Sequence, residues 1–561
     1  MSAPGFNEKR TLLVLKIDRL RRQALAGIRL AAGRLTPMGN VPPERLLRAP
    51  QDIRTADPTV ATDLYAGTLF FCGQQVETNG LAVFEVELPS EAFGAALHGF
   101  SWLRHLRAAD RSVTRAHGRA LVKQWAGLGR RLPPVATTPE VSARRLLSLL
   151  QNAPFLLEDA EDSFYRLYMR LIGREMRRLW RRRSLARRDL QGALVTMAVA
   201  AAAAAIPGGE GLARRAARGL SRHIGQALHP DGGPVSRNAG DLPELLLDLL
   251  SVRQLMVARE IALPTPLSRQ IRKIYPMIRF FRLGDGGLAR FHGAGGTRSD
   301  LLATVLAHDP DGAPVPRLAR ETGFARLAAG HSAVLVDLGG VPVAAQSLSA
   351  HASANAFEWS HGERLIVINC GTPSPARSDW RALARETAAH STLTLRERSS
   401  AFIYGADGPL LGVARARGSS FRDGAVEGRD IECVDDGYLR RHGVRHLRRL
   451  SLSEDGNRLE GHDALVTAEG KPPRGRDFPH VLRFHLAPET EVTGLEGREV
   501  TLRCGRLRIA FVASSGDVHV EESVLFSALA GMRRTRQIVV TRQGNTDVPI
   551  DWSFSVDAPE A

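Results

Sequence analysis

The spacing of apolar residues changes once along this chain. From about Ala92 to Phe281 they recur every three or four positions, as in VSARRLLSLLQNAPFLL and LPELLLDLLSVRQLMVA. That spacing places apolar side chains on one face of an α-helix. After about His331 the chain consists of short valine-rich segments, such as AVLVDLG, RLIVINCG and RQIVVT, separated by Gly, Asp, Asn and Ser. Such segments are typical of a large antiparallel β-sandwich, so the pattern predicts a helical part followed by a β part.

The chain before the helical part has a different composition. Residues 1–60 are basic and contain the stretch LTPMGNVPPERLLRAPQD, which is typical of a partly flexible surface segment. Between Asp63 and Pro89, the runs TLFFC and LAVFEVEL predict a small β element that covers the helices. We therefore expect three regions: a basic, partly flexible segment over 1–60, a helical domain over 61–310 and a β-sandwich domain over 311–561.

The longest apolar run is ALVTMAVAAAAAAI, from Ala193 to Ile206. It is shorter than the ~20 residues that a helix needs to cross a bilayer, so we interpret it as a buried helix and expect no transmembrane segment. Near the N-terminus, Lys16 and Asp18 interrupt the short apolar run that follows Lys9 and Arg10. No secretory signal is predicted from that pattern.

The composition is that of a multidomain globular protein with a basic surplus. Hydrophobic residues make up 43% of the 561 residues, and Lys+Arg outnumber Asp+Glu by 76 to 59, a formal net charge of +17. Because most of the basic residues are arginines, whose planar forks pair with carboxylate, sulfate or phosphate, an anionic partner is favoured. The alternative is that an arginine-rich genome supplies solvated arginines without a ligand. Nucleic acid is an unlikely partner, since six tyrosines offer few stacking platforms and no nucleic-acid module is recognisable.

The four cysteines are far apart in the sequence. Cys72, Cys370, Cys433 and Cys504 form no CxxC pair, which argues against a zinc finger, a redox motif or a dense disulfide framework. We interpret them as buried thiols.

Two segments of the chain resemble landmarks of one known family. The first is HPDGGPVSRNAGDLPELLLDLLSVRQ (229–254), followed by FFRLGDGGLARFHGAG (280–295). The second is AHASANAFEWSHGERLIVINCG (350–371), followed by WRALARETAAHSTLTL (380–395). In order and spacing these segments resemble the heparinase II/III-like proteins, and the resemblance covers roughly residues 60–555.

The resemblance implies an N-terminal α/α toroid, an incomplete helical barrel, followed by a large antiparallel β-sandwich. It implies a polysaccharide lyase-like enzyme that cleaves an acidic, uronate-containing glycan by β-elimination, with an acidic polysaccharide as the partner. The alternative is a non-catalytic acidic-glycan-binding or cell-envelope scaffold protein on the same fold. The resemblance suggests the cell envelope or periplasm, and the cytoplasm is the alternative because no export signal is visible. The sequence does not define the oligomeric state.

β-Elimination on a uronate requires a group that neutralises the sugar carboxylate, a base that removes the C5 proton and an acid that protonates the leaving oxygen. Residues Asp241, Pro243 and Glu244 predict a helix start, which places Arg237 and Asn238 in the loop before it. We interpret Arg237 and Asn238 as the candidates that hold the carboxylate. In the alternative interpretation, Asn238 caps the backbone locally and Arg237 is solvated.

The sequence departs from the family pattern in two catalytic residues. Family lyases carry a catalytic tyrosine in or near this loop, whereas no tyrosine occurs here between Tyr168 and Tyr275. The apolar neighbours of Tyr275 favour a packing role for it. Some family lyases also carry a catalytic histidine at the position matched here by Ser349. These departures favour the non-catalytic alternative.

A hairpin is expected in the β part. The runs from His351 to Trp359 and from Leu365 to Cys370 flank the turn SHGE, and pairing about that turn would place Asn369 close to His351. Both side chains are therefore expected to face one site.

In family members that bind a metal, the matching ligands are His, Asp and a later His. The residues here are His351, Asn369 and His390, and a neutral Asn lacks the anionic oxygen that helps to hold zinc. Zinc would therefore be weakly held. If the site is catalytic, His351 is the candidate base and His390 orients or replaces it; the alternative is that both histidines form hydrogen bonds within a buried polar cluster.

Two further sites are weaker candidates. The glycine-rich segment GDGGLARFHGAGG has no GK[ST] ending, so we interpret it as a crossover between domains, with Asp285 and His292 as candidate substrate-binding residues. The stretch from Arg174 to Arg188 is densely basic at helical spacing and could bind a polyanion or a membrane surface. A solvated helix face is the alternative.

Overall fold

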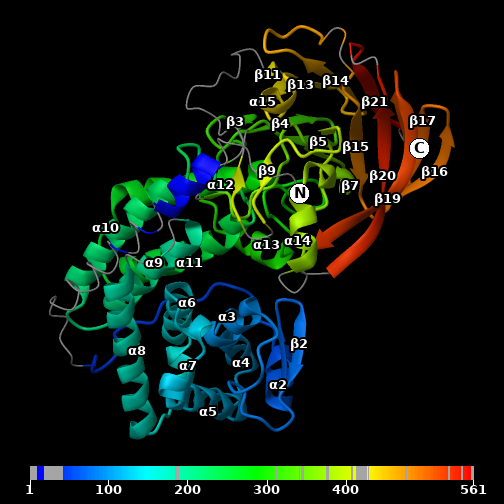
Figure 1. Ribbon diagram of the computed structural model, residues 1–561. Coiled ribbons are helices and arrows are strands. Elements are labelled where there is room, and N and C mark those ends of the chain that lie inside the picture. Colours follow the sequence, from blue (N-terminus) through cyan, green and yellow to red (C-terminus); the bar gives the residue numbers. More distant parts are fainter. Residues whose placement is uncertain are drawn as a thin grey trace.

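The structure is a computed structural model in which a helical part is followed by two large antiparallel sheets (Figure 1). It describes residues 9–17, 20, 24, 42–183, 186, 189–310, 312–339, 342, 346–374, 378–405, 408–411, 426–427, 429–473, 475, 477–527, 531–544 and 547–557. Half of residues 1–60, the segment for which partial flexibility is expected, lies outside these residues.

The helical part alternates with loops from Thr59 to Ala307. Its helices are α2 (Thr59–Ala66), α3 (Glu91–Gly99), α4 (Leu103–Ala109), α5 (Ser112–Leu128), α6 (Pro139–Gln151), α7 (Ala153–Leu157), α8 (Asp162–Arg182), α9 (Leu190–Ala205), α10 (Glu210–Ala227), α11 (Asp241–Ala258), α12 (Thr265–Phe281) and α13 (Ser299–Ala307). Two short helices, α14 (Ser378–Ala384) and α15 (Leu439–His442), lie within the β part.

Inner and outer helices differ in how much of their surface is apolar. Every residue of α9 except Gln191 and Thr196 is buried, and α11 is buried over most of its circumference. Helices α8, α10 and α12 instead bury the apolar side chains of one face and carry arginines on the opposite face. Because a helix that is apolar all round must be covered on all sides, α9 and α11 form the inner layer of the toroid and α8, α10 and α12 its outer layer.

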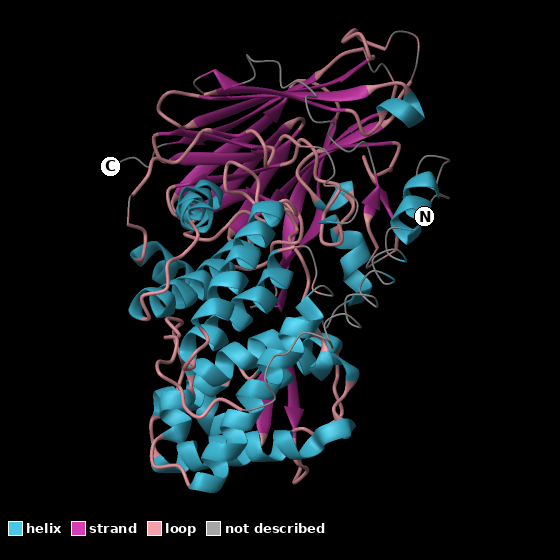
Figure 2. Cartoon of the chain, turned by 90° about the vertical axis from the view of Figure 1, so that its left-hand side faces the viewer, coloured by secondary structure: helices cyan, strands magenta, loops and turns pink. Residues whose placement is uncertain are grey.

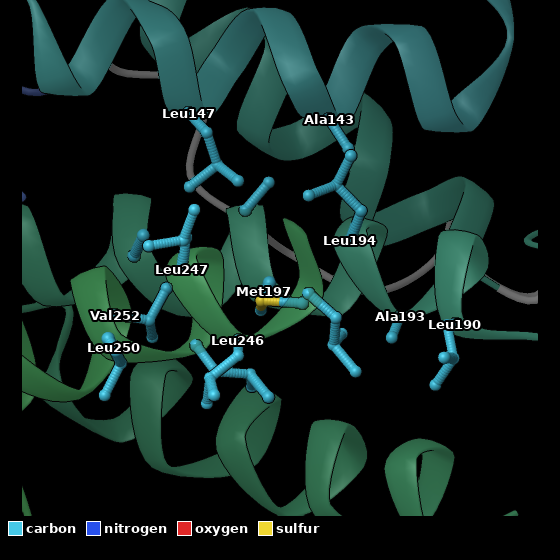
Figure 3. Close-up of a cluster of buried hydrophobic side chains, with 14 of the residues drawn as sticks. Ala143, Leu147, Leu190, Ala193, Leu194, Met197, Leu246, Leu247, Leu250 and Val252 are labelled. Atoms are coloured by element: carbon cyan, nitrogen blue, oxygen red, sulfur yellow. The ribbon is translucent and has the colours of Figure 1, made fainter. Parts of the chain in front are cut away.

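The core of the toroid is formed where α6, α9 and α11 meet. Figure 3 shows Leu147 of α6, Met197 of α9 and Leu246 of α11 pointing into one apolar cluster. The alanine run predicted to be a buried helix is α9, and that prediction is confirmed. Among the described residues, no helix is long and apolar enough to span a membrane.

The small β element near the start of the helical part is a hairpin of β1 (Thr68–Phe71) and β2 (Gln74–Glu77). The run TLFFC contributes β1, as predicted, but the strand predicted for LAVFEVEL is wrong. Residues 81–88 form turns instead, with Glu85 N donating to Ala82 O. Their apolar side chains Phe84 and Val86 are buried against the helices, and the alternation that suggested a strand reflects this one-sided burial.

The β part forms two sheets that pack face to face (Figure 2). The nine-stranded sheet contains β3 (Leu318–Ala319), β4 (Phe324–Ala329), β5 (Ser332–Asp337), β6 (Phe357–His361), β7 (Arg364–Ile368), β8 (Leu393–Leu395), β15 (His480–Leu486), β19 (Asp517–Ser527) and β20 (Gly531–Arg542). The eight-stranded sheet contains β11 (Val426–Glu427), β12 (Asp430–Asp435), β13 (Arg445–Leu452), β14 (Arg458–Val466), β16 (Thr490–Glu496), β17 (Glu499–Cys504), β18 (Leu507–Ala513) and β21 (Ile550–Asp557). A separate pair is formed by β9 (Phe402–Ile403) and β10 (Leu410–Leu411).

The sheets are held together by aromatic side chains from both inner faces. Phe357 stacks on Trp552 with ring centroids 5.6 Å apart, and Phe484 lies edge-on to the same ring at 4.7 Å. The large antiparallel β-sandwich predicted from the valine-rich segments is therefore confirmed. The free cysteines Cys370, Cys433 and Cys504 are buried, as expected, whereas Cys72 is only half-buried.

The predicted hairpin is formed by β6 and β7, but its register differs from the expectation. The first strand begins at Phe357, so His351 lies before it in an irregular segment. Asn355 in that segment has φ of +60°, which interrupts an extended strand. Strand pairing therefore does not place Asn369 beside His351.

Candidate functional site at the junction of the two parts

The loop between α10 and α11 joins the helical part to the nine-stranded sheet. Asp231 accepts hydrogen bonds from the backbone N (2.9 Å) and the hydroxyl (2.6 Å) of Thr322. Gly232 has φ of +96°, and a Cβ at this position would lie 2.4 Å from Lys273 O of α12. Only glycine fits both the backbone conformation and the close approach, so these residues fix the path of the loop that carries Arg237 and Asn238.

The guanidinium of Arg237 is enclosed by the β part. Its Nε donates to Thr322 O (2.8 Å) and its Nη2 donates to Gly323 O (2.8 Å) and to the carboxylate of Asp337. The guanidinium also lies 4.5 Å from the ring centroid of Phe324. The side chain predicted to hold a sugar carboxylate is thus buried and directed at a protein carboxylate.

Asp337, at the end of β5, is the centre of this cluster. It accepts from Arg237, from His292 Nε2 (2.8 Å), from Ser353 Oγ (2.7 Å) and from Gly339 N (3.0 Å). Burial by itself would raise the pKa of Asp337, but the charge of Arg237 and the hydrogen bonds to the carboxylate outweigh it and lower the pKa to about 2. The carboxylate is therefore charged at neutral pH and compensated by Arg237.

His292, predicted to bind substrate, belongs to the same buried cluster. Burial and the charge of Arg237 lower the pKa of His292. A neutral ring that donates from Nε2 to Asp337 has a lone pair on Nδ1, which accepts from His351 N at 3.3 Å. Asp285, the other predicted substrate-binding residue, lies in the turn after α12, where its Oδ1 accepts from Gly287 N at 2.9 Å.

Asn238 caps the backbone of its own loop. Its Oδ1 accepts from Gly240 N at 3.0 Å, in the turn that leads into α11. The helix itself begins at Asp241. A Cβ on Gly240 would lie 3.6 Å from Ala294, and one on Gly293 would lie 2.9 Å from Ser349. The Asn238 loop and the segment before His351 therefore both pack against the loop that carries His292.

His351 and His390 are directly hydrogen-bonded to each other. His351 Nδ1 lies 3.1 Å from His390 Nε2, and His390 Nδ1 lies 2.8 Å from Glu386 O. Because a carbonyl oxygen only accepts, His390 Nδ1 carries the proton and its Nε2 is the acceptor. His351 must then donate from Nδ1, which leaves a lone pair on its Nε2, 3.3 Å from the hydroxyl of Thr372.

Both rings of this pair are buried and neutral. Burial, followed by the proximity of His390, lowers the pKa of His351 well below its ordinary value. Burial also lowers the pKa of His390, to about 4. The half-buried hydroxyl of Thr372 covers the one open ring nitrogen.

The residues of the proposed metal triplet do not fit a zinc ion. The amide Nδ2 of Asn369 donates to Glu358 (3.3 Å) and its Oδ1 accepts from Ser391 N (2.9 Å), so the side chain is engaged away from His351 and His390. Two neutral imidazoles and an occupied neutral amide provide no anionic ligand. Among the described residues there is no group of three or more His, Cys, Asp or Glu side chains that could hold a metal ion.

Sequence reasoning missed Asp337, Ser353 and Thr372. Asp337 could have been found, because a carboxylate that ends the apolar strand AVLVD needs a partner if it is buried. Thr372 carries no comparable signal, since a threonine in a Gly/Pro-rich loop is usually solvated. Tyr275 is buried in α12, in agreement with the packing role expected from its neighbours.

Comparison with known proteins places this geometry in a family. Residues 312–553 match the family model described as heparinase II/III-like, C-terminal. The chain is 30% identical over 530 residues to FtsZ-localized protein C of Caulobacter vibrioides, covering 91% of this chain and 90% of that protein. The chain belongs to the heparinase II/III-like family.

Solved structures support the same fold. A crystal structure of heparinase III aligns with a TM-score of 0.68 at 12% identity, covering 95% of this chain and 89% of that one. A mutant of the heparan sulfate lyase HepC from Pedobacter heparinus aligns with a TM-score of 0.61 at 11% identity, covering 96% and 89%. At such identities the likeness concerns the fold, an α/α toroid followed by antiparallel β-sheets.

Proposed function

We propose that this chain is a non-catalytic acidic-glycan-binding scaffold protein on a polysaccharide lyase fold. The observation that carries the proposal is the buried ion pair between Arg237 and Asp337. In a lyase the positive group of this loop would be free to neutralise a sugar carboxylate. In this chain Arg237 is paired with the carboxylate of Asp337, and this pair joins the helical part to the β part.

The histidines support the same proposal. A general base must reach the proton that it removes and must have a pKa near the working pH. His351 is buried, its open nitrogen is covered by Thr372, and its pKa lies well below the ordinary value. The loop that carries Arg237 also has no tyrosine to act as acid or base.

The place of action is proposed from the named relative. FtsZ-localized protein C of Caulobacter vibrioides is described by its location with FtsZ. Since the two chains match over nine tenths of their lengths, we propose that this protein also acts where FtsZ assembles. A fluorescent fusion that follows FtsZ in dividing cells would support the proposal, and a uniform distribution would contradict it.

A second candidate function is a lyase in which His351 acts as the base. It is favoured by the direction of three hydrogen bonds. His390 donates to Glu386 O and His351 donates to His390, so His351 Nε2 keeps a lone pair, and this lone pair faces the half-buried hydroxyl of Thr372. This nitrogen would act as a base only if Thr372 and the residues that bury His351 moved away from it. In this second candidate function Asn238 would hold the carboxylate, because Arg237 is enclosed by the β part and paired with Asp337.

One experiment separates the two functions. Purified protein is incubated with a panel of acidic polysaccharides, and both binding and the ultraviolet absorbance of unsaturated uronate products are measured. We expect binding without unsaturated product, and the same result for His351→Gln. A product signal in the wild-type protein that His351→Gln abolishes would establish the lyase, and absence of binding to every polysaccharide would refute the glycan-binding proposal.

A further inference from the structure

The basic surplus of the chain is concentrated on the outer helices of the toroid. Helix α8 carries seven arginines and two acidic residues, α10 carries four arginines and one glutamate, and α12 carries three arginines, one lysine and no acidic residue. These three helices form a tenth of the chain but supply fifteen basic residues against three acidic ones. Most of the net charge of +17 therefore lies on one layer of the molecule.

The arginines of α8 and α10 form rows. Arg166, Arg170 and Arg174 are spaced by four residues on α8, and Arg214 and Arg218 repeat the spacing on α10. Residues four apart lie above one another on a helix, about 6 Å apart along its axis. All five side chains are exposed. Each row thus presents regularly spaced cations to solvent.

The third helix extends this surface. Arg269, Arg272 and Lys273 are exposed on α12, which packs against α10. In Figure 1, α8 and α10 lie along the left-hand edge of the molecule, and Figure 2 turns this side toward the viewer. We call the outward faces of α8, α10 and α12 the outer wall.

Within the outer wall, Arg166, Arg170, Arg214 and Arg218 have no side-chain ion pair with the part of the chain that the structure describes. Arg174 has a long contact of 3.7 Å with Glu175, a residue that also pairs with Arg145 in the interior, and its guanidinium lies 6.0 Å from the ring centroid of Trp125. On the inner side of the same helix, burial and then the charge of Arg178 lower the pKa of Arg182. Like charges crowded without acidic neighbours cost free energy, so an anionic ligand at this surface would relieve their repulsion.

The outer wall also lacks the apolar side chains that a membrane surface site uses. All residues of α8, α10 and α12 are described, and none of their large apolar or aromatic side chains is exposed. Membrane-surface helices bury Trp, Phe or Leu below the head groups, and single-stranded nucleic acids stack on exposed aromatic rings. The side chains of Tyr165, Leu167 and Trp180 are only partly exposed on α8, so this surface offers little of either kind of contact.

The arrangement of the three helices groups the rows of arginines. Helices α10 and α12 pack against each other, so their exposed basic residues form one surface, and α8 packs against α9, as α10 does. Arginine forks pair bidentately with carboxylates, and the oxygens of a sulfate group can accept the same hydrogen bonds.

We propose that the outer wall binds a linear acidic polysaccharide, outside the junction that contains Arg237 and His351. The inference rests on the proposed glycan-binding function and names the surface that binds the glycan. Binding is electrostatic: the polymer releases counterions as its charged groups pair with arginines, and affinity falls steeply with salt.

The test compares two variants that remove the same charge. The wall variant replaces six exposed arginines that form no side-chain ion pair among the described residues: Arg166→Gln, Arg170→Gln, Arg214→Gln, Arg218→Gln, Arg269→Gln and Arg272→Gln. The matched control replaces six exposed arginines of the β part: Arg364→Gln, Arg440→Gln, Arg506→Gln, Arg508→Gln, Arg534→Gln and Arg536→Gln. Affinity for a heparin fragment is measured at several salt concentrations, and circular dichroism checks that both variants are folded.

We expect the wall variant to bind heparin about 100-fold more weakly at physiological salt if three of the six arginines contact the polymer at once, and its salt dependence to be shallower. The control should change affinity several-fold at most. If both variants bind like the wild type, the wall inference is wrong while the proposed function stands. If the wild type binds no acidic polysaccharide, the proposed function fails as well. If the wall variant loses binding to a DNA duplex or to anionic vesicles but keeps heparin binding, the partner is of another class and the inference is overturned.

Discussion

Like Arg145, which pairs with Glu175 in the interior, Arg237 uses its charge inside the molecule, whereas the arginines of the outer wall are exposed. Its guanidinium compensates the buried carboxylate of Asp337, lies over Phe324 and donates to two backbone carbonyls. Its backbone has φ of +64°, a conformation that non-glycine residues adopt rarely and that the surrounding contacts hold in place. At this residue, the positive charge stabilises the junction between the helical part and the β part.

Substitution of Arg237 should therefore affect stability more than binding. Arg237→Gln leaves the Asp337 carboxylate buried without a counter-charge, and we expect the free energy of unfolding to fall by about 3–5 kcal/mol. Urea denaturation followed by tryptophan fluorescence measures the change. The double variant with Asp337→Asn should be more stable than the single one, because no unpaired charge remains. A loss below about 0.5 kcal/mol for Arg237→Gln, as expected for the exposed Arg166→Gln, would contradict this account.

The loop between α10 and α11 shows how one element fixes a site. Its tight path depends on Gly232, whose backbone conformation and closeness to α12 both exclude a side chain. The loop is then joined to the β part by Asp231 and Arg237. The position of Asn238 and of the start of α11 follows from these contacts.

A pair of glycine substitutions tests the importance of this loop. Gly232→Ala introduces a strained φ and a contact of 2.4 Å with Lys273 O, whereas Gly80→Ala introduces the strained φ of +83° alone, with no atom within 4 Å. We expect Gly80→Ala to cost about 1 kcal/mol and Gly232→Ala several kcal/mol more. Thermal unfolding of the two variants measures the difference. Equal melting temperatures would show that the approach of α12 does not constrain the loop.

On the scale of the whole molecule, buried neutral histidines make stability depend on pH. Burial lowers the pKa of His390 to about 4 and that of His485 to about 3, while the same rings in the unfolded chain titrate near 6.5. Between these values the unfolded chain binds protons that the folded chain does not. Stability is therefore complete above pH ~6.5 and is lost as the pH falls toward 4.

The melting temperature should fall accordingly on mild acidification. The shift of His390 alone corresponds to about 3 kcal/mol, lost progressively from pH ~6.5 to ~4. Asp337 acts in a lower window, because its pKa of about 2 lies below the ordinary value and its contribution is lost only as the pH falls toward 2. Calorimetry from pH 8 to 5 tests the prediction, and His390→Gln should flatten the profile. An unchanged melting temperature over this range would contradict it.

The sequence by itself determined the order of the helical and β parts. Helices are indicated by apolar residues every three or four positions and strands by short valine-rich segments, and both patterns can be read locally. It also predicted the buried helix α9 and the hairpin of β6 and β7, since length and turn residues are local signals. The strand predicted for residues 81–88 was wrong. Alternating apolar and polar residues indicate that one side of a segment is buried, and a turn that packs against helices is also buried on one side.

The partners of the charged and hydrogen-bonding groups at the junction were decided by tertiary structure alone. Arg237 and Asp337 are 100 residues apart, and nothing in the local sequence distinguishes an arginine that binds a sugar carboxylate from one that binds a buried aspartate. The same holds for His351 and His390, whose direction of proton donation is set by the carbonyl of Glu386. Charge compensation and hydrogen-bond direction depend on which groups are in contact in the folded protein. The periodicity of apolar residues along the chain does not specify these contacts.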